Sequence, residues 1–158
     1  MSKVLVAYFS VGGTTAKAAK ALASAEGADL FAIRPETPYI PADLDYTNKQ
    51  SRTTLEMTDP SCRPATVGKV DNMAQYAVIF VGFPIWWGRE PSAVDTFLTS
   101  YDFSGKTIVP FATSGMSGIG DSGENMQRLA KGAKVLPGKR FKNSVSSGDL
   151  KNWAEEWL

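Results

Sequence analysis

Apolar residues along the chain alternate between short continuous runs and longer segments with helical spacing. The first run, KVLVAYF, is rich in β-branched and aromatic residues, which is typical of a strand buried on both faces of a parallel sheet. Four later runs are similarly apolar. We therefore predict five strands, at residues 3–9, 29–33, 77–83, 106–114 and 134–136.

A helical period of apolar residues follows the first strand. From Thr15 small apolar residues keep to one face as far as Gly27, which suits a C-terminal cap. Strands that alternate with helices in this way indicate an α/β fold with helices on both faces of one sheet. The same period predicts three further helices, at residues 91–101, 122–133 and 150–158.

Residues 34–75 break the alternation. Five prolines interrupt this segment, and only residues 43–57 keep a weak helical face. A structureless connection of this length is unusual in a compact domain. We therefore expect one helix flanked by irregular chain.

Length and charge limit the classes of partner. A chain of 158 residues suits one domain with a sizeable core, and no linker or repeat divides it, so we expect residues 1–158 to form a single domain. The 17 basic and 16 acidic residues give a net charge of +1, and no cluster of lysines and arginines follows the pattern that tracks a phosphate backbone. We expect no nucleic-acid partner.

The chain has no histidine and a single cysteine, Cys62. This excludes an internal disulfide, histidine-based triads and histidine- or cysteine-rich metal sites, so we expect no bound metal and name no catalytic residue. Difficult chemistry must then come from another titratable group or from a cofactor.

The apolar runs are too short for a membrane span, which needs about 20 residues, so we expect no membrane partner. The apolar start and a later ASA, at residues 23–25, superficially resemble a signal peptide. Gly12, Gly13 and Lys17 interrupt that pattern, and cleavage would delete a core strand. We interpret the protein as cytoplasmic.

Unusual residues follow three of the predicted strands, whose carboxyl ends meet at one edge of a doubly wound sheet. After the first strand, glycines and hydroxyl side chains lead into a helix N-terminus, where free N–H groups and the helix dipole favour an anion. A phosphate is the natural guest, although these residues would also serve as a simple helix cap. The candidate residues of this first loop are Ser10, Val11, Gly12, Gly13, Thr14 and Thr15.

The other two loops suit a flat aromatic guest. Two adjacent indoles after the third strand could stack on such a ring, although one of them could equally belong to the core. A glycine- and serine-rich loop after the fourth strand offers backbone groups to a ring edge, although such loops are often merely flexible. The candidates are Pro84, Ile85, Trp86, Trp87 and Gly88 in the second loop and Thr113, Ser114, Gly115 and Gly118 in the third.

Together the loops YFSVGGTT, PIWWG and TSGMSGIG resemble those of the flavodoxin superfamily, in particular a flavodoxin-like family with a P-I-W-W-G loop. The resemblance covers essentially the whole chain. It implies a single-domain, doubly wound, five-stranded parallel sheet in the order 2-1-3-4-5 and noncovalently bound FMN. Residues 10–15 would hold the phosphate, and residues 84–88 and 113–115 would flank the flavin ring. Tyr46 and the segment PGKRF at 137–141 also resemble family positions, without an assigned role.

Two residues depart from that pattern. Met116 stands where a glycine is frequent and could narrow the pocket at the ring edge. Arg89 follows the Trp-Trp-Gly loop, and near the ring its charge would stabilise the anionic reduced flavin; the alternative is an outward, solvated arginine.

The function classes stay open at this point. A one-electron carrier would use an exposed flavin edge, although a net charge of +1 differs from the acidic surface usual among such carriers. A small FMN-dependent NAD(P)H oxidoreductase acting on quinones or nitroaromatics would use the 35–75 segment as part of a substrate wall. A non-redox binding module is a third class. We slightly favour the carrier, with a redox protein or a small-molecule electron acceptor as partner and the oligomeric state open.

Overall fold

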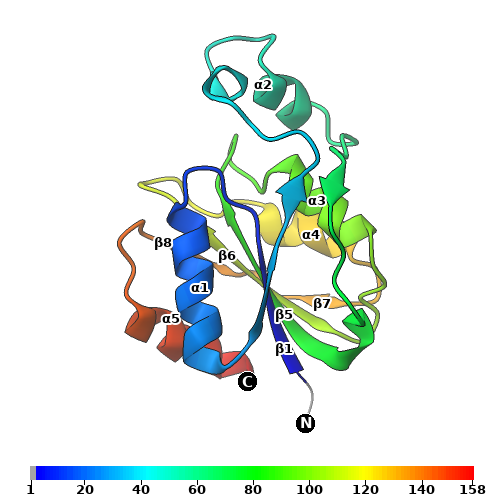
Figure 1. The fold of residues 1–158 in the computed structure, drawn as a ribbon, viewed down its shortest axis with the longest axis vertical. Coiled ribbons are helices and arrows are strands. Elements are labelled where there is room, and N and C mark those ends of the chain that lie inside the picture. Colours follow the sequence, from blue (N-terminus) through cyan, green and yellow to red (C-terminus); the bar gives the residue numbers. More distant parts are fainter. Residues whose placement is uncertain (1–2) are drawn as a thin grey trace.

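A parallel β-sheet forms the centre of the computed structural model, which describes residues 3–158 (Figure 1). Neighbouring strands pair in parallel, and their order in the sheet is the 2-1-3-4-5 order implied by the resemblance to flavodoxins. Its spatial order is β2 (Asp29–Ala32), β1 (Lys3–Tyr8), β5 (Tyr76–Pro84), β6 (Thr107–Thr113) and then β7 (Lys134–Val135), with β8 (Lys139–Phe141) also on β6.

The fifth position of the sheet is divided, so six strands replace the five expected. Even-numbered residues of β6 face this side, since Ile108 O accepts from Leu136 N–H and Ser114 N–H donates to Phe141 O. Pro110 faces the same side and has no N–H to donate, which interrupts the ladder. At the gap Gly138 adopts φ +79°, and a Cβ there would lie 2.4 Å from Pro110 O.

Helices cover both faces of the sheet, as expected (Figure 1). On one face lie α1 (Thr14–Glu26) and α5 (Ser147–Ala154), and α5 continues into a short 3₁₀ helix, η3 (Glu155–Trp157). On the other lie α3 (Ser92–Thr99) and α4 (Ser122–Leu129). Alternate strand residues enter the two cores: Leu5 and Ala7 pack toward α3, whereas Val6 packs toward α1. Within residues 3–158 no helix combines the length and apolar character of a membrane span.

The segment between β2 and β5 is more regular at its base and less helical at its tip than expected. Its two ends pair as the antiparallel strands β3 (Arg34–Pro35) and β4 (Thr66–Val67). The single helix expected at 43–57 is reduced to η1 (Pro41–Leu44) and α2 (Arg52–Met57), and η2 (Met73–Gln75) precedes β5. Figure 1 shows α2 standing beyond the sheet edge.

Local side-chain hydrogen bonds explain the shortened helix. Asp45 Oδ1 accepts from Thr47 N–H at 3.0 Å, and Asn48 Oδ1 accepts from Gln50 N–H at 2.9 Å. Such turns compete with a helical backbone. The helix begins only after Ser51, whose Oγ accepts from Thr54 N–H as an N-cap.

The close approach of a ring to Gly82 gives a test of the central sheet. A Cβ at this position would lie 2.3 Å from the ring of Phe111, its neighbour on β6. Gly82→Ala should therefore lower the free energy of unfolding by about 2–3 kcal/mol, measured by urea denaturation. Gly118→Ala is the matched control because open space surrounds Gly118, and its effect should stay within about 0.5 kcal/mol. Equal effects of the two substitutions would contradict the packing described.

Candidate functional site

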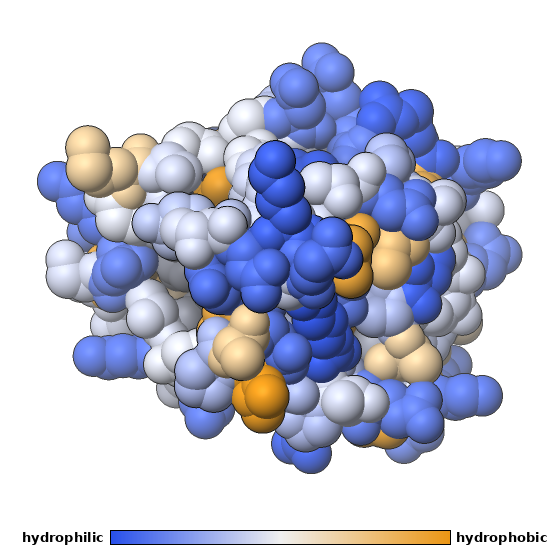
Figure 2. Space-filling model, turned by 90° about the horizontal axis from the view of Figure 1, so that it is seen from above, coloured by the Kyte–Doolittle hydropathy of each residue, from blue (hydrophilic) through white to orange (hydrophobic). Residues whose placement is uncertain are grey.

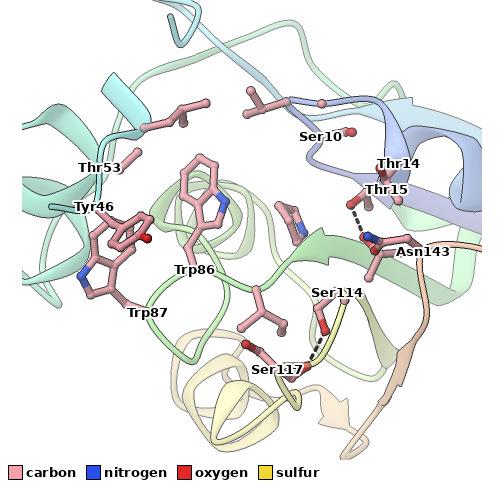
Figure 3. Close-up of a pocket in the computed structure, with 17 residues that line it drawn as sticks. Ser10, Thr14, Thr15, Tyr46, Thr53, Trp86, Trp87, Ser114, Ser117 and Asn143 are labelled. Atoms are coloured by element: carbon pink, nitrogen blue, oxygen red, sulfur yellow. Dashed lines mark hydrogen bonds between the residues drawn. The ribbon is translucent and has the colours of Figure 1, made fainter. Parts of the chain in front are cut away.

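A cavity of about 700 Å³ opens at the carboxyl edge of the sheet, within the size range of small-molecule and cofactor sites (Figure 3). All three predicted loops contribute to it. The predicted residues that line it are Ser10, Val11, Gly12, Thr14, Thr15, Pro84, Ile85, Trp86, Trp87, Thr113, Ser114 and Gly115. Gly13, Gly88 and Gly118 do not line it.

The first loop joins β1 to α1 through a left-handed residue. Gly13 adopts φ +91° and its N–H donates to Ser10 Oγ at 3.2 Å, so it shapes the turn instead of lining the cavity. No side chain caps α1, and its first turn carries no acidic residue. The N-terminus of this 13-residue helix, beside Thr14 and Thr15, therefore offers free N–H groups and the positive end of the dipole.

A buried hydrogen bond joins the first loop to the third. The hydroxyls of Thr15 and Thr113 lie 2.7 Å apart, and both side chains are buried. This bond fixes the end of β6 against the start of α1. The two loops therefore keep one relative position at the floor of the cavity.

The two indoles of the second loop have different environments. Trp86 packs edge-on against Phe9 and Tyr39, with ring centroids 5.3 Å apart in both cases. Trp87 is 43% exposed at the rim. One indole therefore belongs partly to the core, and the other is free to meet a ligand.

A tight turn holds these indoles. Trp86 and Arg89 exchange two backbone hydrogen bonds of 3.0 and 3.1 Å, and both central residues have positive φ, Trp87 at 50° and Gly88 at 75°. This is the pattern of a type I′ turn, which favours Asn-Gly, so a tryptophan in the left-handed region is strained. Gly88 supports the turn from outside the cavity, and its carbonyl oxygen would lie 2.5 Å from a Cβ on Gly120.

The third loop is held by residues outside the predicted set. Ser114 Oγ accepts from Arg140 Nε at 2.9 Å, and Ser114 O accepts from Arg140 Nη2 at 3.0 Å. Ser114 Oγ in turn donates to Ser117 O. Gly118 is exposed, beyond this fixed part of the loop.

Five lining residues were missing from the prediction: Leu44, Tyr46, Thr53, Ser117 and Asn143. Three of them belong to the segment around α2, and Figure 3 shows Tyr46 and Thr53 on the side opposite Ser10 and Thr15. The only signal for this group was the resemblance noted at Tyr46. Asn143 follows β8, a strand that the apolar pattern did not reveal.

The α2 segment is fixed to the second loop through an aromatic and charged cluster. Tyr39 donates to Glu56, which accepts from Arg52 Nε at 3.1 Å, and the Arg52 guanidinium lies 3.8 Å from the centre of the Tyr39 ring. Burial and the Glu56 carboxylate raise the pKa of Tyr39, which remains a neutral donor. Because Tyr39 also contacts Trp86, the segment forms a fixed wall of the cavity.

Arg89 lies where neither alternative placed it. Its guanidinium donates to Asp95 Oδ2 at 3.2 Å and to Met57 O at 3.3 Å, and it does not line the cavity. The guanidinium therefore points away from the cavity, because a buried carboxylate under the turn attracts its charge. Met116 is 93% exposed and also lies outside the lining, so it does not narrow the cavity.

Two buried carboxyl groups lie below the Trp86–Arg89 turn. Glu90 and Asp95 are almost fully buried, and Glu90 Oε2 accepts from Asn125 Nδ2 at 3.1 Å. Burial and the neighbouring Asp95 raise the pKa of Glu90 to about 9, although the Arg89 guanidinium opposes this shift. Glu90 is therefore protonated at neutral pH, and one proton between the two carboxyls limits their repulsion.

This shift predicts a pH-dependent stability. The pKa of Glu90 in the folded protein lies above its value near 4.3 in the unfolded chain. The contribution of Glu90 to the free energy of unfolding is therefore complete below about pH 4 and is lost as the pH rises toward 9. Glu90→Gln keeps a neutral acceptor for Asn125 and removes this loss. Urea denaturation at pH 8.5 should show the variant more stable than the wild type by roughly 1–3 kcal/mol, with a smaller difference at pH 5. A difference that does not change with pH would contradict the assignment.

The strained turn gives a second test. Trp87→Asn places a residue that tolerates positive φ before Gly88, and the exposed indole contributes little packing. The free energy of unfolding should rise by about 1 kcal/mol in urea denaturation without added ligand. Trp87→Ala keeps the unfavourable φ and serves as control. An asparagine variant no more stable than the alanine variant would show that the turn stores no strain.

Several known proteins share this architecture. A family model described as flavodoxin matches residues 3–157. Among solved structures, two proteins provisionally described as flavoproteins are similar along almost the whole chain. The one from Bacteroides eggerthii DSM 20697 has 44% identity and a TM-score of 0.89, with 99% of this chain and 98% of that chain covered. The one from Bacteroides uniformis ATCC 8492 has 42% identity and a TM-score of 0.91, with 98% of each chain covered.

A more distant structure shares the fold. It is a flavoprotein in complex with FMN from Lactobacillus acidophilus NCFM, with 19% identity, a TM-score of 0.72 and coverage of 98% of this chain and 99% of that chain. No curated protein matches the chain. The match of the family model over nearly every residue shows that the chain belongs to the flavodoxin family.

Proposed function

We propose that this protein binds FMN noncovalently and carries electrons through the flavin. The observation that carries the proposal is the cavity itself, which has a free helix N-terminus at one end and the indoles of Trp86 and Trp87 at the other. An anionic phosphate and a flat aromatic ring are the guests that suit those two ends. The complex of the Lactobacillus acidophilus flavoprotein with FMN, on the same fold, supports the proposal.

The lining divides into two groups in this proposal. The amides and hydroxyls of Ser10, Gly12, Thr14 and Thr15 hold the phosphate, beside Val11, while Gly13 shapes the turn. The ring lies between the second and third loops, in contact with residues 84–87 and 113–115. Gly88 shapes the Trp86–Arg89 turn without lining the cavity, and Gly118 is exposed outside the lining.

Among residues 3–158, no charged side chain lines the cavity. Bound FMN would supply reversible one- and two-electron chemistry, and the chain would supply orientation and exclusion of water. Within residues 3–158, Tyr46 is the one titratable side chain of the lining. No carboxylate or amine of these residues belongs to the lining. A site without an acid or base pair suits electron transfer better than a proton-coupled conversion of substrate.

A redox protein is the partner that this arrangement suits. Trp87 and Tyr46, 43% and 78% exposed, lie at the rim. Figure 2 views the molecule from above, on the side where α2 stands, and shows mostly hydrophilic and pale colours with small separate apolar patches. Surfaces of this kind are typical of transient complexes rather than permanent ones.

A second function has its own supporting observation. Leu44, Tyr46 and Thr53 close one side of the cavity, and such a wall could hold a flat acceptor against the flavin. The alternative is therefore a small FMN-dependent NAD(P)H oxidoreductase that reduces quinones or nitroaromatics. A non-redox module on the same scaffold would not need the indole pair.

Absorbance spectroscopy tests the proposal. Protein mixed with FMN and desalted should retain flavin with perturbed bands. Riboflavin, which lacks the phosphate, should bind at least about tenfold more weakly, since the helix N-terminus would lose its anion. Raising NaCl from about 0.05 to 0.5 M should change FMN affinity less than about threefold, because the lining residues that the structure describes carry no charged side chain.

The outcomes separate the candidates. Loss of all flavin on desalting would overturn the proposal, and equal affinities for FMN and riboflavin would overturn the phosphate assignment. Anaerobic bleaching of retained flavin by NADH or NADPH would favour the oxidoreductase. Flavin that only external reductants or partner reductases reduce would favour the carrier.

A further inference from the structure

The segment PGKRF at 137–141 contributes a cation to the edge of the cavity. Arg140 lies in β8 and is half-buried. Its Nε and Nη2 donate to Ser114 Oγ and Ser114 O, at 2.9 and 3.0 Å. Within residues 3–158 it is the one charged side chain whose side-chain hydrogen bonds end on a residue lining the cavity.

Ser114 is fully occupied by the protein itself. Its N–H donates to Phe141 O, its hydroxyl donates to Ser117 O, and its two oxygens accept from Arg140. The serine therefore has no spare donor for a ligand. Its place in the lining brings the Arg140 guanidinium one residue away from any occupant of the cavity.

The charge of Arg140 is not neutralised by an ion pair. No carboxylate of residues 3–158 lies within 4.0 Å of it, whereas Arg52, Arg63 and Arg89 each have an acidic partner within that distance. A half-buried, unpaired cation acts over several ångströms, because solvent screens it only in part. The field of this cation reaches the cavity behind Ser114.

We propose that Arg140 raises the reduction potential of the bound flavin by stabilising its anionic, two-electron-reduced form, and that it fixes the third loop through Ser114. This inference rests on the proposed binding of FMN. It assigns to Arg140 the effect that the sequence had suggested for Arg89, whose charge is held by Asp95 instead. Arg140 acts here as a positioning residue and as a source of charge, without touching the ring.

A potentiometric titration of the FMN-loaded protein tests the charge. Arg140→Gln should weaken the affinity for reduced FMN relative to oxidised FMN by about tenfold, which lowers the two-electron midpoint potential by about 30 mV. Arg140→Lys keeps the charge but not the forked pair of hydrogen bonds, so its midpoint should stay close to that of the wild type. Arg128→Gln removes an exposed arginine from α4 as the matched control and should leave the midpoint unchanged.

Melting of the FMN-free proteins separates loop positioning from charge. Both Arg140 variants should melt below the wild type, since both disturb the hydrogen bonds to Ser114. Equal midpoints for wild type and Arg140→Gln, or equal shifts in the glutamine and lysine variants, would overturn the proposal while leaving FMN binding intact. A wild type that retains no FMN would overturn the proposed function and this inference together. If Arg140→Gln does not fold, Arg140→Met, which keeps an apolar stem, takes its place in the same titration.

Discussion

Burial of the central sheet on both faces is the constraint from which the rest of the structure follows. Leu5, Ile79 and Ile108 pack toward α3 and α4, and Val6, Phe80 and Val109 pack toward α1 and α5. These strands run parallel and are joined by crossovers on the two faces, so their carboxyl ends meet at one edge. The loops at that edge are free of the packing demand, and they carry the polar and strained residues.

Charged side chains of residues 3–158 lie around the cavity and not in its lining. The lining contributed by the described part of the chain, residues 3–158, has no charged side chain, while charged groups lie one layer behind it. Below the second loop, Arg89 pairs with Asp95 beside the protonated Glu90, next to the strained Trp87 turn. Behind the third loop, Arg140 donates to Ser114 and has no carboxylate of residues 3–158 within 4.0 Å. A neutral lining favours binding through dipoles and shape, and the charges behind it influence the occupant through space.

The α2 segment gives the flavodoxin scaffold an additional wall. Its two ends are joined as β3 and β4, and its tip is bound to the second loop by contacts among Tyr39, Arg52 and Trp86. Pro-rich connections of this length are often mobile. Here the wall encloses one side of the cavity and leaves the rim at Trp87 open, a shape compatible with either a docking protein or a small acceptor.

The sequence by itself determined the alternation of strands with helices and the three loops, because hydrophobic period and loop composition are local properties. The order of the strands in the sheet came from the resemblance of those loops to a known family, not from the period. It did not determine β8, the division of the fifth position or the shortened α2. These depend on the missing N–H of Pro110 within its ladder and on Asx turns that compete with a helix.

The sequence predicted the functional site only in part as well. The three loops supplied most of the lining, but Thr53 and Asn143 come from segments in which no binding motif was recognised. The sequence also could not say which arginine lies beside the cavity. Tertiary structure decided this, because Asp95 lies beneath the second loop and holds Arg89, while β8 places Arg140 beside Ser114. The direction of a long charged side chain depends on partners that are distant in sequence, and only the fold brings them together.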